Sequence, residues 1–483
     1  MAVVSGSARG VFIAGEWRDP PGGRTFGVSD PATGEEIARV ADADAALVER
    51  AVTAASDAFA GWATTPAEAR ADLLHRAHHL LVERGEIVAR LLTQENGKPL
   101  AESRGEVAMS ARFLLWHAEE AKRAYGRVVP ASARDRRVLV LRQPVGVVAA
   151  ITPWNFPLSM VARKVAPALA AGCTVILRPA KKTPLVAIEL FEIFAEAGVP
   201  PGVVGLVTTS DARAFADAIL DDRRVRKITF TGSNEVGKTL FERSAVHLKR
   251  VSLELGGHAP FLVFEDADLE AAATAAVLSR FRNAGQTCVC TNRLLVQRSV
   301  LREITERVTE RVARLQVGNG LEEGIDVGPL IDRSALAKVE AHQSDAIARG
   351  ARVLVGGERV ADLPGGLFYQ PTVLEGVTPA AIVAREETFG PLLPIIEFET
   401  EAEALRLAND TPYGLAAYVH TRDLARTFRI VEGLEYGIVG VNDPLPVGPH
   451  IPFGGMKESG IGREAGIEGI AEFLETKAVS IGI

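Results

Sequence analysis

Cys288 is the best candidate for a nucleophile in this sequence of 483 residues. It lies in the run NAGQTCVC (residues 283–290), which follows a predicted helix and contains small residues that let a substrate approach the sulfur. A cysteine near helix termini and polar amides can be a thiolate, the reactive form, at neutral pH. The alternative is a buried packing cysteine, which is the default interpretation of Cys173 in its apolar context.

Two other segments carry polar groups at predicted strand ends. Glu254 ends an apolar run and is followed by Leu255 and two glycines, so its carboxylate can project into a cleft. Asn155 lies in the rigid turn TPWNFP (residues 152–157) after another strand and offers an amide donor. An ordinary surface glutamate and a purely structural turn are the alternatives.

The run GSNEVGKT (residues 232–239) matches the phosphate-loop pattern of nucleoside triphosphatases letter for letter. At least three strand–helix pairs precede it, whereas such a loop normally follows the first strand of its domain. We therefore predict only that amides at the start of this helix bind a phosphate-bearing cofactor. No metal site is predicted, because Cys288 and Cys290 lack a second ligand pair and His75, His78 and His79 have no accompanying acid or cysteine cluster.

The segments that would position these residues alternate between short apolar strands and helices of about 10–15 residues, which predicts an α/β fold with a helix-covered parallel sheet. Ligands bind such sheets at the carboxyl ends of the strands. Strands are expected at 145–151, 174–177, 203–207, 226–230 and 248–253, with helices at 158–171, 184–197, 212–220 and 234–243.

A second α/β unit is predicted to begin near Leu255, with strands at 260–264 and 294–297 and helices at 269–281 and 301–315. Residues 46–95 and 99–124 are predicted to form long helices before the first sheet. Residues 128–141 alternate apolar and charged side chains like an exposed β-ribbon, and the tail 472–483 is predicted to be extended. Such strands often pair across a subunit interface.

Composition is that of an ordinary globular protein, with 47% hydrophobic and 24% charged residues. The net charge of −7 argues against nucleic acid and acidic lipid as partners. Three cysteines are too few for a disulfide framework, and no apolar run approaches the ~18 residues of a membrane span. With no signal-peptide pattern at the start, we expect a cytoplasmic protein.

Five motifs together resemble those of the aldehyde dehydrogenase superfamily, in the same order and spacing from about Phe12 onward: TPWNFP, LELGG (253–257), GQTCVC (285–290), ETFGP (387–391) and PFGGMKESG (452–460). The resemblance implies two Rossmann-like parallel-sheet domains and a β-ribbon for assembly into a homodimer or homotetramer. Residues 1–122 and 142–254 would form the cofactor-binding domain, 255–442 the catalytic domain and 123–141 with 470–483 the ribbon, while 443–469 return to the active-site region.

The resemblance also implies a mechanism. Cys288 would attack the aldehyde carbon to give a thiohemiacetal, while the Asn155 amide and the N–H of Cys288 hold the oxyanion. After hydride transfer to nicotinamide, Glu254 would activate the water that hydrolyses the thioester, and Lys164 matches a lysine near cofactor and active site. Relatives that pass the thioester to coenzyme A lack this glutamate, and the retained groups argue against a catalytically inactive structural relative.

The cofactor contacts implied by the resemblance are Thr152, Pro153, Trp154, Arg178, Ala180, Lys181, Gly232, Ser233, Gly237, Leu255, Glu387 and Phe389. Family members commonly carry a glutamate that binds the adenosine ribose of NAD where this sequence has Lys181. A carboxylate repels a 2′-phosphate and an ammonium attracts it. We therefore predict that NADP is preferred, with NAD as the alternative.

Within the superfamily, the sequence is most similar to the succinate-semialdehyde dehydrogenases. Arg163 and Arg282 match two arginines that bind the distal carboxylate of the substrate, and guanidinium–carboxylate pairing explains the selection of an acid semialdehyde. Trp116 and Phe453 are assigned to the same substrate site.

One difference from the succinate-semialdehyde dehydrogenases leaves the identity of the aldehyde substrate undecided. The subgroup's serine falls near Val447 or Gly448, which carry no hydroxyl, so another aliphatic or aromatic aldehyde is the alternative substrate. Resembling enzymes also suggest that Cys290 forms a strained, easily reduced disulfide with Cys288. Simple packing is the alternative for Cys290.

Overall fold

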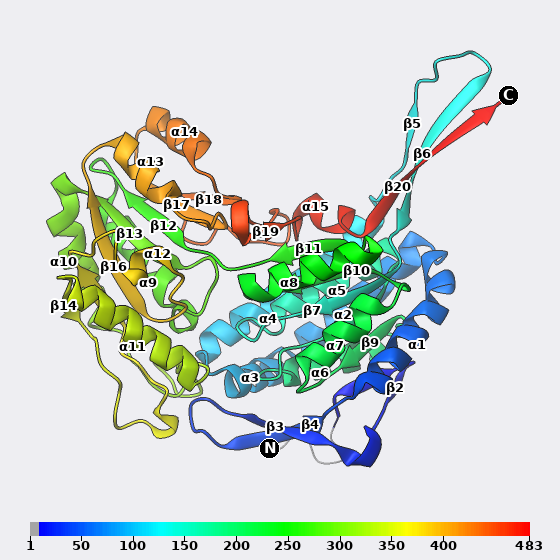
Figure 1. Ribbon diagram of the computed structural model, residues 1–483, viewed down its shortest axis with the longest axis horizontal. Coiled ribbons are helices and arrows are strands. Elements are labelled where there is room, and N and C mark those ends of the chain that lie inside the picture. Colours follow the sequence, from blue (N-terminus) through cyan, green and yellow to red (C-terminus); the bar gives the residue numbers. More distant parts are fainter. Residues whose placement is uncertain (1–8) are drawn as a thin grey trace.

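Five parallel strands form the centre of an eight-stranded sheet in the computed structural model, which describes residues 9–483 (Figure 1). Most of their residues are buried, as in a sheet covered by helices on both faces. The order is β19-β11-β10-β7-β8-β9-β1-β2. The bounds are β1 Val11–Ile13, β2 Glu16–Trp17, β7 Val147–Ile151, β8 Thr174–Arg178, β9 Val204–Val207, β10 Val225–Thr231, β11 Arg250–Glu254 and β19 Gly460–Ile461.

The predicted parallel sheet is confirmed, but its edges are antiparallel. β1 pairs with β9 and β19 pairs with β11 in the antiparallel sense. The strands β1 and β19 have only three and two residues, so their sequences are too short to show a periodic pattern.

The helices of this first unit are α1 Ala45–Ala63, α2 Ala67–Glu83, α3 Gly85–Asn96, α4 Leu100–Ala121, α5 Ser159–Ala171, α6 Leu185–Glu196, α7 Ala212–Asp221, α8 Asn234–Ser244 and α15 Gly466–Ala471. The predicted helical segment 46–95 is divided into α1, α2 and α3. Pro66 begins α2, and Gly97, with φ of 92°, ends α3 in the left-handed conformation that glycine favours. The short loop after Gly97 then runs beside the turn 152–157.

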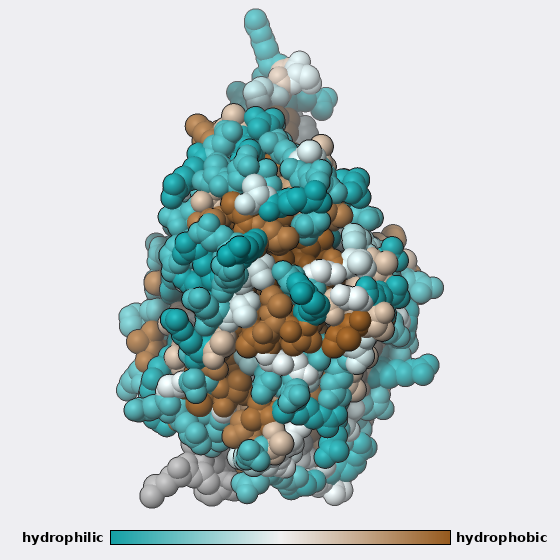
Figure 2. Space-filling model, turned by 90° about the vertical axis from the view of Figure 1, so that its left-hand side faces the viewer, coloured by the Kyte–Doolittle hydropathy of each residue, from teal (hydrophilic) through white to brown (hydrophobic). Residues whose placement is uncertain are grey.

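A seven-stranded sheet organises the second unit in the order β14-β15-β16-β13-β12-β17-β18, parallel except for the β14–β15 pair. Its strands are β12 Ala259–Val263, β13 Thr291–Gln297, β14 Arg352–Val355, β15 Thr372–Glu375, β16 Leu392–Phe398, β17 Ala416–His420 and β18 Ile438–Val441. Its helices are α9 Leu269–Phe281, α10 Leu301–Val312, α11 Arg333–Ala348, α12 Ile382–Arg385, α13 Glu401–Asn409 and α14 Leu424–Gly433. Figure 2 views the molecule from this end, where hydrophilic side chains surround hydrophobic ones near the middle of the face.

A three-stranded ribbon projects away from both units (Figure 1). It consists of β5 Arg127–Val129, β6 Arg136–Pro144 and the C-terminal β20 Leu474–Gly482, and β20 pairs with the whole of β6. The predicted extended segments thus pair with each other within one chain. Their role in assembly and the predicted domain limits stay predictions.

The remaining elements between residues 9 and 483 are a hairpin and six 3₁₀ turns. The hairpin is β3 Thr25–Ser29 with β4 Glu36–Ala41. The turns are η1 Pro21–Gly23, η2 Ala245–His247, η3 Arg282–Gly285, η4 Arg298–Val300, η5 Pro364–Gly366 and η6 Lys457–Ser459. Over residues 9–483, none of the helices has the length and apolar character that crossing a membrane requires.

Candidate active site

The carboxyl ends of four strands bring the predicted catalytic segments together. Ile151 at the end of β7 pairs with Arg178 of β8 and Phe230 of β10, and Thr231 pairs with Glu254 at the end of β11. The turn 152–157, Gly232 and Leu255 follow these strand ends directly. This register places the strand ends side by side, and the predicted position of the ligand is at this edge of the sheet.

Cys288 lies where two cavities meet. The first cavity, of about 440 Å³, is lined by eight of the predicted site residues besides Cys288: Pro153, Trp154, Asn155, Gly232, Ser233, Leu255, Glu387 and Phe389. The second, of about 240 Å³, is lined by Arg163, Arg282, Phe453 and again Cys288. The sulfur is thus accessible from two sides, and each cavity can hold one partner of a two-substrate reaction.

The surroundings of Cys288 favour its thiol form. Burial, and then the Glu387 and Glu254 carboxylates, raise the pKa of Cys288 to about 12, although Arg163 opposes them. That Cys288 can react as a thiolate therefore stays a prediction, and it needs a base that takes the thiol proton. Cys288 follows the C-terminal end of α9 and η3, where the helix dipole does not favour an anion.

Glu254 is a buried carboxylate whose oxygens are unpartnered. Neither side-chain oxygen has a hydrogen-bond partner among residues 9–483. Oε1 lies so close to Gly454 that any side chain at position 454 would place its Cβ 2.8 Å from this oxygen. Burial, and then the charge of Glu464, raises the pKa of Glu254 well above its ordinary value. A buried carboxylate with a raised pKa is suited to accept a proton.

Two cations of α5 share a partner that the sequence analysis missed. Lys164 donates to Glu464 and, at 3.2 Å, to Thr229 Oγ1, and Arg163 Nη2 lies 2.8 Å from Glu464 Oε2. Burial alone would raise the pKa of Glu464, but the charges of Lys164 and Arg163 together hold it below its ordinary value. No motif marks Glu464, which is 300 residues from Lys164 in the sequence.

Asn155 is buried and tied to the cysteine loop. Its Nδ2 donates to the Gln286 carbonyl at 3.0 Å, and its own carbonyl accepts from Asn283 Nδ2 at 2.9 Å. Asn283 itself has φ of 50°, a left-handed conformation at the turn just before Cys288. Asn155 and Cys288 therefore line the same cavity, and the role of Asn155 toward an oxyanion stays a prediction.

The walls of the first cavity have features that fit a dinucleotide. Glu387 Oε1 accepts the Gly257 N–H at 3.0 Å, and burial raises the pKa of Glu387 to about 7. The ring of Phe389 meets that of Trp154 edge to face at 5.5 Å between centroids. At Gly232 a Cβ would come within 2.4 Å of the Phe230 ring, so a glycine fits there without moving that ring. The absence of a side chain leaves the backbone of Gly232 accessible from the cavity.

The start of α8 resembles a phosphate loop only in its letters. Lys238 bonds to Glu458 at 2.8 Å, and Thr239 donates to the Glu235 carbonyl of its own helix, so neither group faces a nucleotide. Ser233 caps the helix, and Gly237 leaves room for Leu255, because a Cβ there would lie 2.4 Å from its side chain. The triphosphatase alternative therefore has no structural basis in these residues.

The predicted adenosine-end residues Arg178, Ala180 and Lys181 lie at and just beyond the end of β8. Lys181 is exposed, with its ammonium 5.6 Å from the centre of the Phe26 ring. Its neighbour Lys182, missed by the sequence analysis, lines the first cavity and bonds to Asp332. Thr152 is buried behind the cavity, and its hydroxyl has no hydrogen-bond partner among residues 9–483.

The second cavity combines two arginines with apolar and acidic groups. Arg163 stacks on Phe453 at 3.9 Å from the ring centre, and Arg282 lies 5.0 Å from the centre of the Phe156 ring. Glu102 also lines the cavity, and burial raises its pKa to about 7 although Lys98 and Arg282 oppose this. The predicted substrate residue Trp116 instead donates its indole N–H to the Gly466 carbonyl at 3.2 Å.

The comparisons with known proteins identify the family of this site. A model of the aldehyde dehydrogenase family matches residues 17–479. The chain belongs to this family. It is 50% identical over 471 residues to 3-sulfolactaldehyde dehydrogenase of Pseudomonas putida, covering 98% of this chain and 96% of that protein.

A second relative is the succinate-semialdehyde dehydrogenase (NADP(+)) GabD of Escherichia coli K12, 49% identical over 472 residues, which cover 98% of this chain and 97% of that protein. The crystal structure of succinate-semialdehyde dehydrogenase from Burkholderia pseudomallei has a TM-score of 0.97 at 47% identity, with 98% of each chain covered. The predicted fold is confirmed, and the chain is an NAD(P)-dependent aldehyde dehydrogenase.

Cys290 of this aldehyde dehydrogenase is not among the residues that line either cavity. It is buried, and its sulfur accepts from Arg280 Nη1 at 3.1 Å and donates to the Gly285 carbonyl at 3.4 Å. Burial raises the pKa of the Cys290 thiol although Arg280 opposes this. Both cysteines are free thiols, and the predicted redox pairing with Cys288 stays a prediction.

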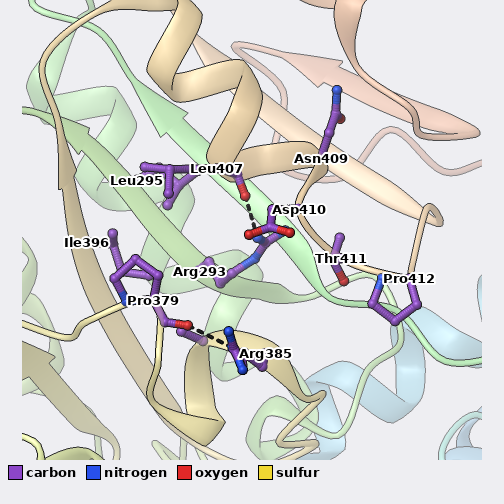
Figure 3. A pocket seen from close by; sticks show the side chains of 11 residues that line it. Arg293, Leu295, Pro379, Arg385, Ile396, Leu407, Asn409, Asp410, Thr411 and Pro412 are labelled. Carbon is purple, nitrogen blue, oxygen red and sulfur yellow. Dashed lines mark hydrogen bonds between the residues drawn. The ribbon is translucent and has the colours of Figure 1, made fainter.

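A third cavity of about 430 Å³ lies in the second unit, which contains the seven-stranded sheet (Figure 3). Its buried Arg293 donates to the carbonyls of His258, Leu407 and Ala408 and to the Tyr436 hydroxyl. This guanidinium thus joins β13 to α13. None of the predicted site residues is among those that line the third cavity.

Proposed function

We propose that this enzyme oxidises an aldehyde with a distal anionic group, such as succinate semialdehyde, to the carboxylate through a covalent adduct on Cys288. The supporting observation is that Cys288 lies between the two cavities, one of which presents a buried arginine. Arg163 Nε has no hydrogen-bond partner among residues 9–483, and Arg282 lines the same cavity. A buried guanidinium with an unused donor is suited to a carboxylate or sulfonate.

The chain's own groups carry the chemistry. The thiol of Cys288 gives its proton to Glu254 or to solvent water, and its sulfur bonds to the carbonyl carbon while the carbonyl oxygen becomes an oxyanion. The Asn155 amide and the Cys288 N–H donate to that oxyanion, and losing one such donor typically costs about 10²–10³ in rate. When bound, a nicotinamide cofactor would supply the acceptor for a hydride. The adduct carbon on Cys288 loses that hydride, and its carbonyl re-forms as a thioester. Glu254 takes a proton from the water that cleaves this thioester to the free acid.

The first cavity fits the cofactor by the chemistry of its walls. The Thr231 hydroxyl is buried without a partner among residues 9–483, Glu387 offers a carboxylate oxygen, and Gly232 keeps the backbone open. The helix α8 directs its amino end toward the same edge and favours a phosphate there. Glu387 and the first turn of α8 are therefore proposed to hold the ribose and the pyrophosphate.

Arg282→Met tests the substrate class. We expect kcat/KM for succinate semialdehyde to fall about 10- to 100-fold, because charged hydrogen bonds contribute about 1.5–3 kcal/mol each. The kcat/KM for an uncharged aldehyde of similar length should change little. Steady-state assays of reduced-cofactor absorbance give both values, and an equal loss for the two aldehydes would contradict the proposed distal anion.

Lys181→Glu tests the proposed preference for NADP. The wild type is expected to have the higher kcat/KM with NADP, and the variant to shift the NADP/NAD ratio about tenfold or more toward NAD, because the carboxylate repels a 2′-phosphate. Lys477→Glu, on the ribbon strand β20, is the matched control for the charge change. A wild-type preference for NAD that Lys181→Glu leaves unchanged would contradict the proposal.

A further inference from the structure

A buried ion pair makes hydrogen bonds to both sides of the turn that contains Asn155. Lys98 and Glu106 are 1% and 4% exposed, and Lys98 Nζ lies 2.6 Å from Glu106 Oε2. The pair lies between the α3–α4 connection and the start of α5. Neither residue belongs to a motif identified in the sequence.

Lys98 holds the turn on one side. Its Nζ donates to the Asn155 carbonyl at 2.7 Å and lies 3.9 Å from the centre of the Phe156 ring. Asn96, two residues earlier, donates to the Trp154 carbonyl at 3.0 Å. Two consecutive carbonyls of the turn are therefore held by one short connection.

Glu106 holds the turn on the other side. Its Oε1 accepts the N–H groups of Leu158 and Ser159 at 3.0 and 3.1 Å, which begin α5. The carboxylate thus satisfies amides at a helix start, where an anion is favoured. Because its other oxygen binds Lys98, the position of Asn155 is linked to that of α5.

This arrangement is not explained by stability alone. Removing two charges from water costs free energy that their attraction offsets only partly, and an apolar pair of similar volume is often as stable. The ion pair fixes the position of the turn, because Lys98 bonds to the Asn155 carbonyl and Glu106 bonds to the N–H groups just after the turn. The Asn155 amide in turn reaches the Gln286 carbonyl, two residues before Cys288.

We propose that Lys98, held by Glu106, is a positioning residue that orients the Asn155 amide toward the reacting carbonyl oxygen. The inference rests on the proposed role of Asn155 in the reaction. Lys98 touches neither substrate nor cofactor in this scheme and acts only through the turn. A misplacement of about 1 Å at a catalytic group can cost about 10²-fold in rate.

A double-mutant cycle between Lys98→Met and Asn155→Ala tests the inference. We expect Lys98→Met to lower kcat about 10- to 100-fold, with KM for the aldehyde changed less than about threefold. In the Asn155→Ala background the same substitution should change kcat less than about threefold, because the amide to be oriented is gone. An equal factor in both backgrounds would overturn the inference.

Two further variants keep the test independent of folding. Lys249→Met removes another buried lysine, which donates to the Asp222 and Val225 carbonyls at 2.6 and 2.8 Å, far along the chain from Asn155. It should lower the melting temperature comparably and leave kcat unchanged. If Lys98→Met does not fold, Glu106→Gln replaces it in the cycle with the same expected non-additivity.

The single variant Asn155→Ala distinguishes a failure of the proposed role of Asn155 from a failure of the positioning inference. If Asn155→Ala alone leaves kcat unchanged, the oxyanion role is wrong, whatever Lys98→Met does. If Asn155→Ala lowers kcat and the Lys98→Met effect persists undiminished in that background, only the positioning inference is wrong.

Discussion

Cys288→Ala is expected to lower kcat by about 10⁴-fold or more, because the sulfur is the atom that bonds to the aldehyde carbon. The alanine side chain fits wherever the cysteine does, so the cofactor should still bind with wild-type affinity. Stopped-flow absorbance of the reduced cofactor should show neither a burst nor a steady state above background.

Cys173→Ala is the matched control for this substitution. Cys173 is fully buried, and its sulfur donates to the Phe473 carbonyl at 3.3 Å, away from both cavities that meet at Cys288. It should lose some thermal stability and keep the wild-type kcat. Substantial turnover by Cys288→Ala would contradict the covalent mechanism.

Glu254→Gln is expected to lower kcat by about 10²–10⁴-fold, because glutamine cannot accept a proton. The sign of the pH dependence follows from the raised pKa of Glu254. Below that pKa the carboxyl is protonated and inactive as a base, so wild-type kcat should rise with pH as Glu254 ionises. The variant should lose this rise, which a kcat profile from pH 6 to 9 would measure.

The rapid phase of the reaction shows which proton Glu254 removes. If it serves only the hydrolysis, Glu254→Gln should retain a fast burst of one reduced cofactor per active site; if it also deprotonates Cys288, the burst itself slows. Glu265→Gln, at the surface beyond β12, is the control and should behave like wild type. An unchanged kcat and pH profile in Glu254→Gln would contradict its role as a base.

The candidate site could be predicted in large part because its residues follow strands. Short apolar strands followed by Asn155, Gly232 and Glu254 are visible in the sequence, and parallel pairing brings their ends to one edge. The same local logic explains the failures. The short antiparallel strands β1 and β19 have no periodicity of their own. The bond from Lys238 to Glu458, which turns that lysine away from a nucleotide, is a contact that the phosphate-loop letters do not report.

The sequence by itself determined which chemical groups are present and at which strand ends they emerge, because those depend on local patterns. Only the tertiary structure decided their charge states and partners. Burial raises the pKa of the Cys288 thiol, and Arg163 and Lys164 share Glu464, which is 300 residues beyond Lys164. Desolvation and contacts between distant residues arise only when the chain is packed, so no spacing along the sequence reports them.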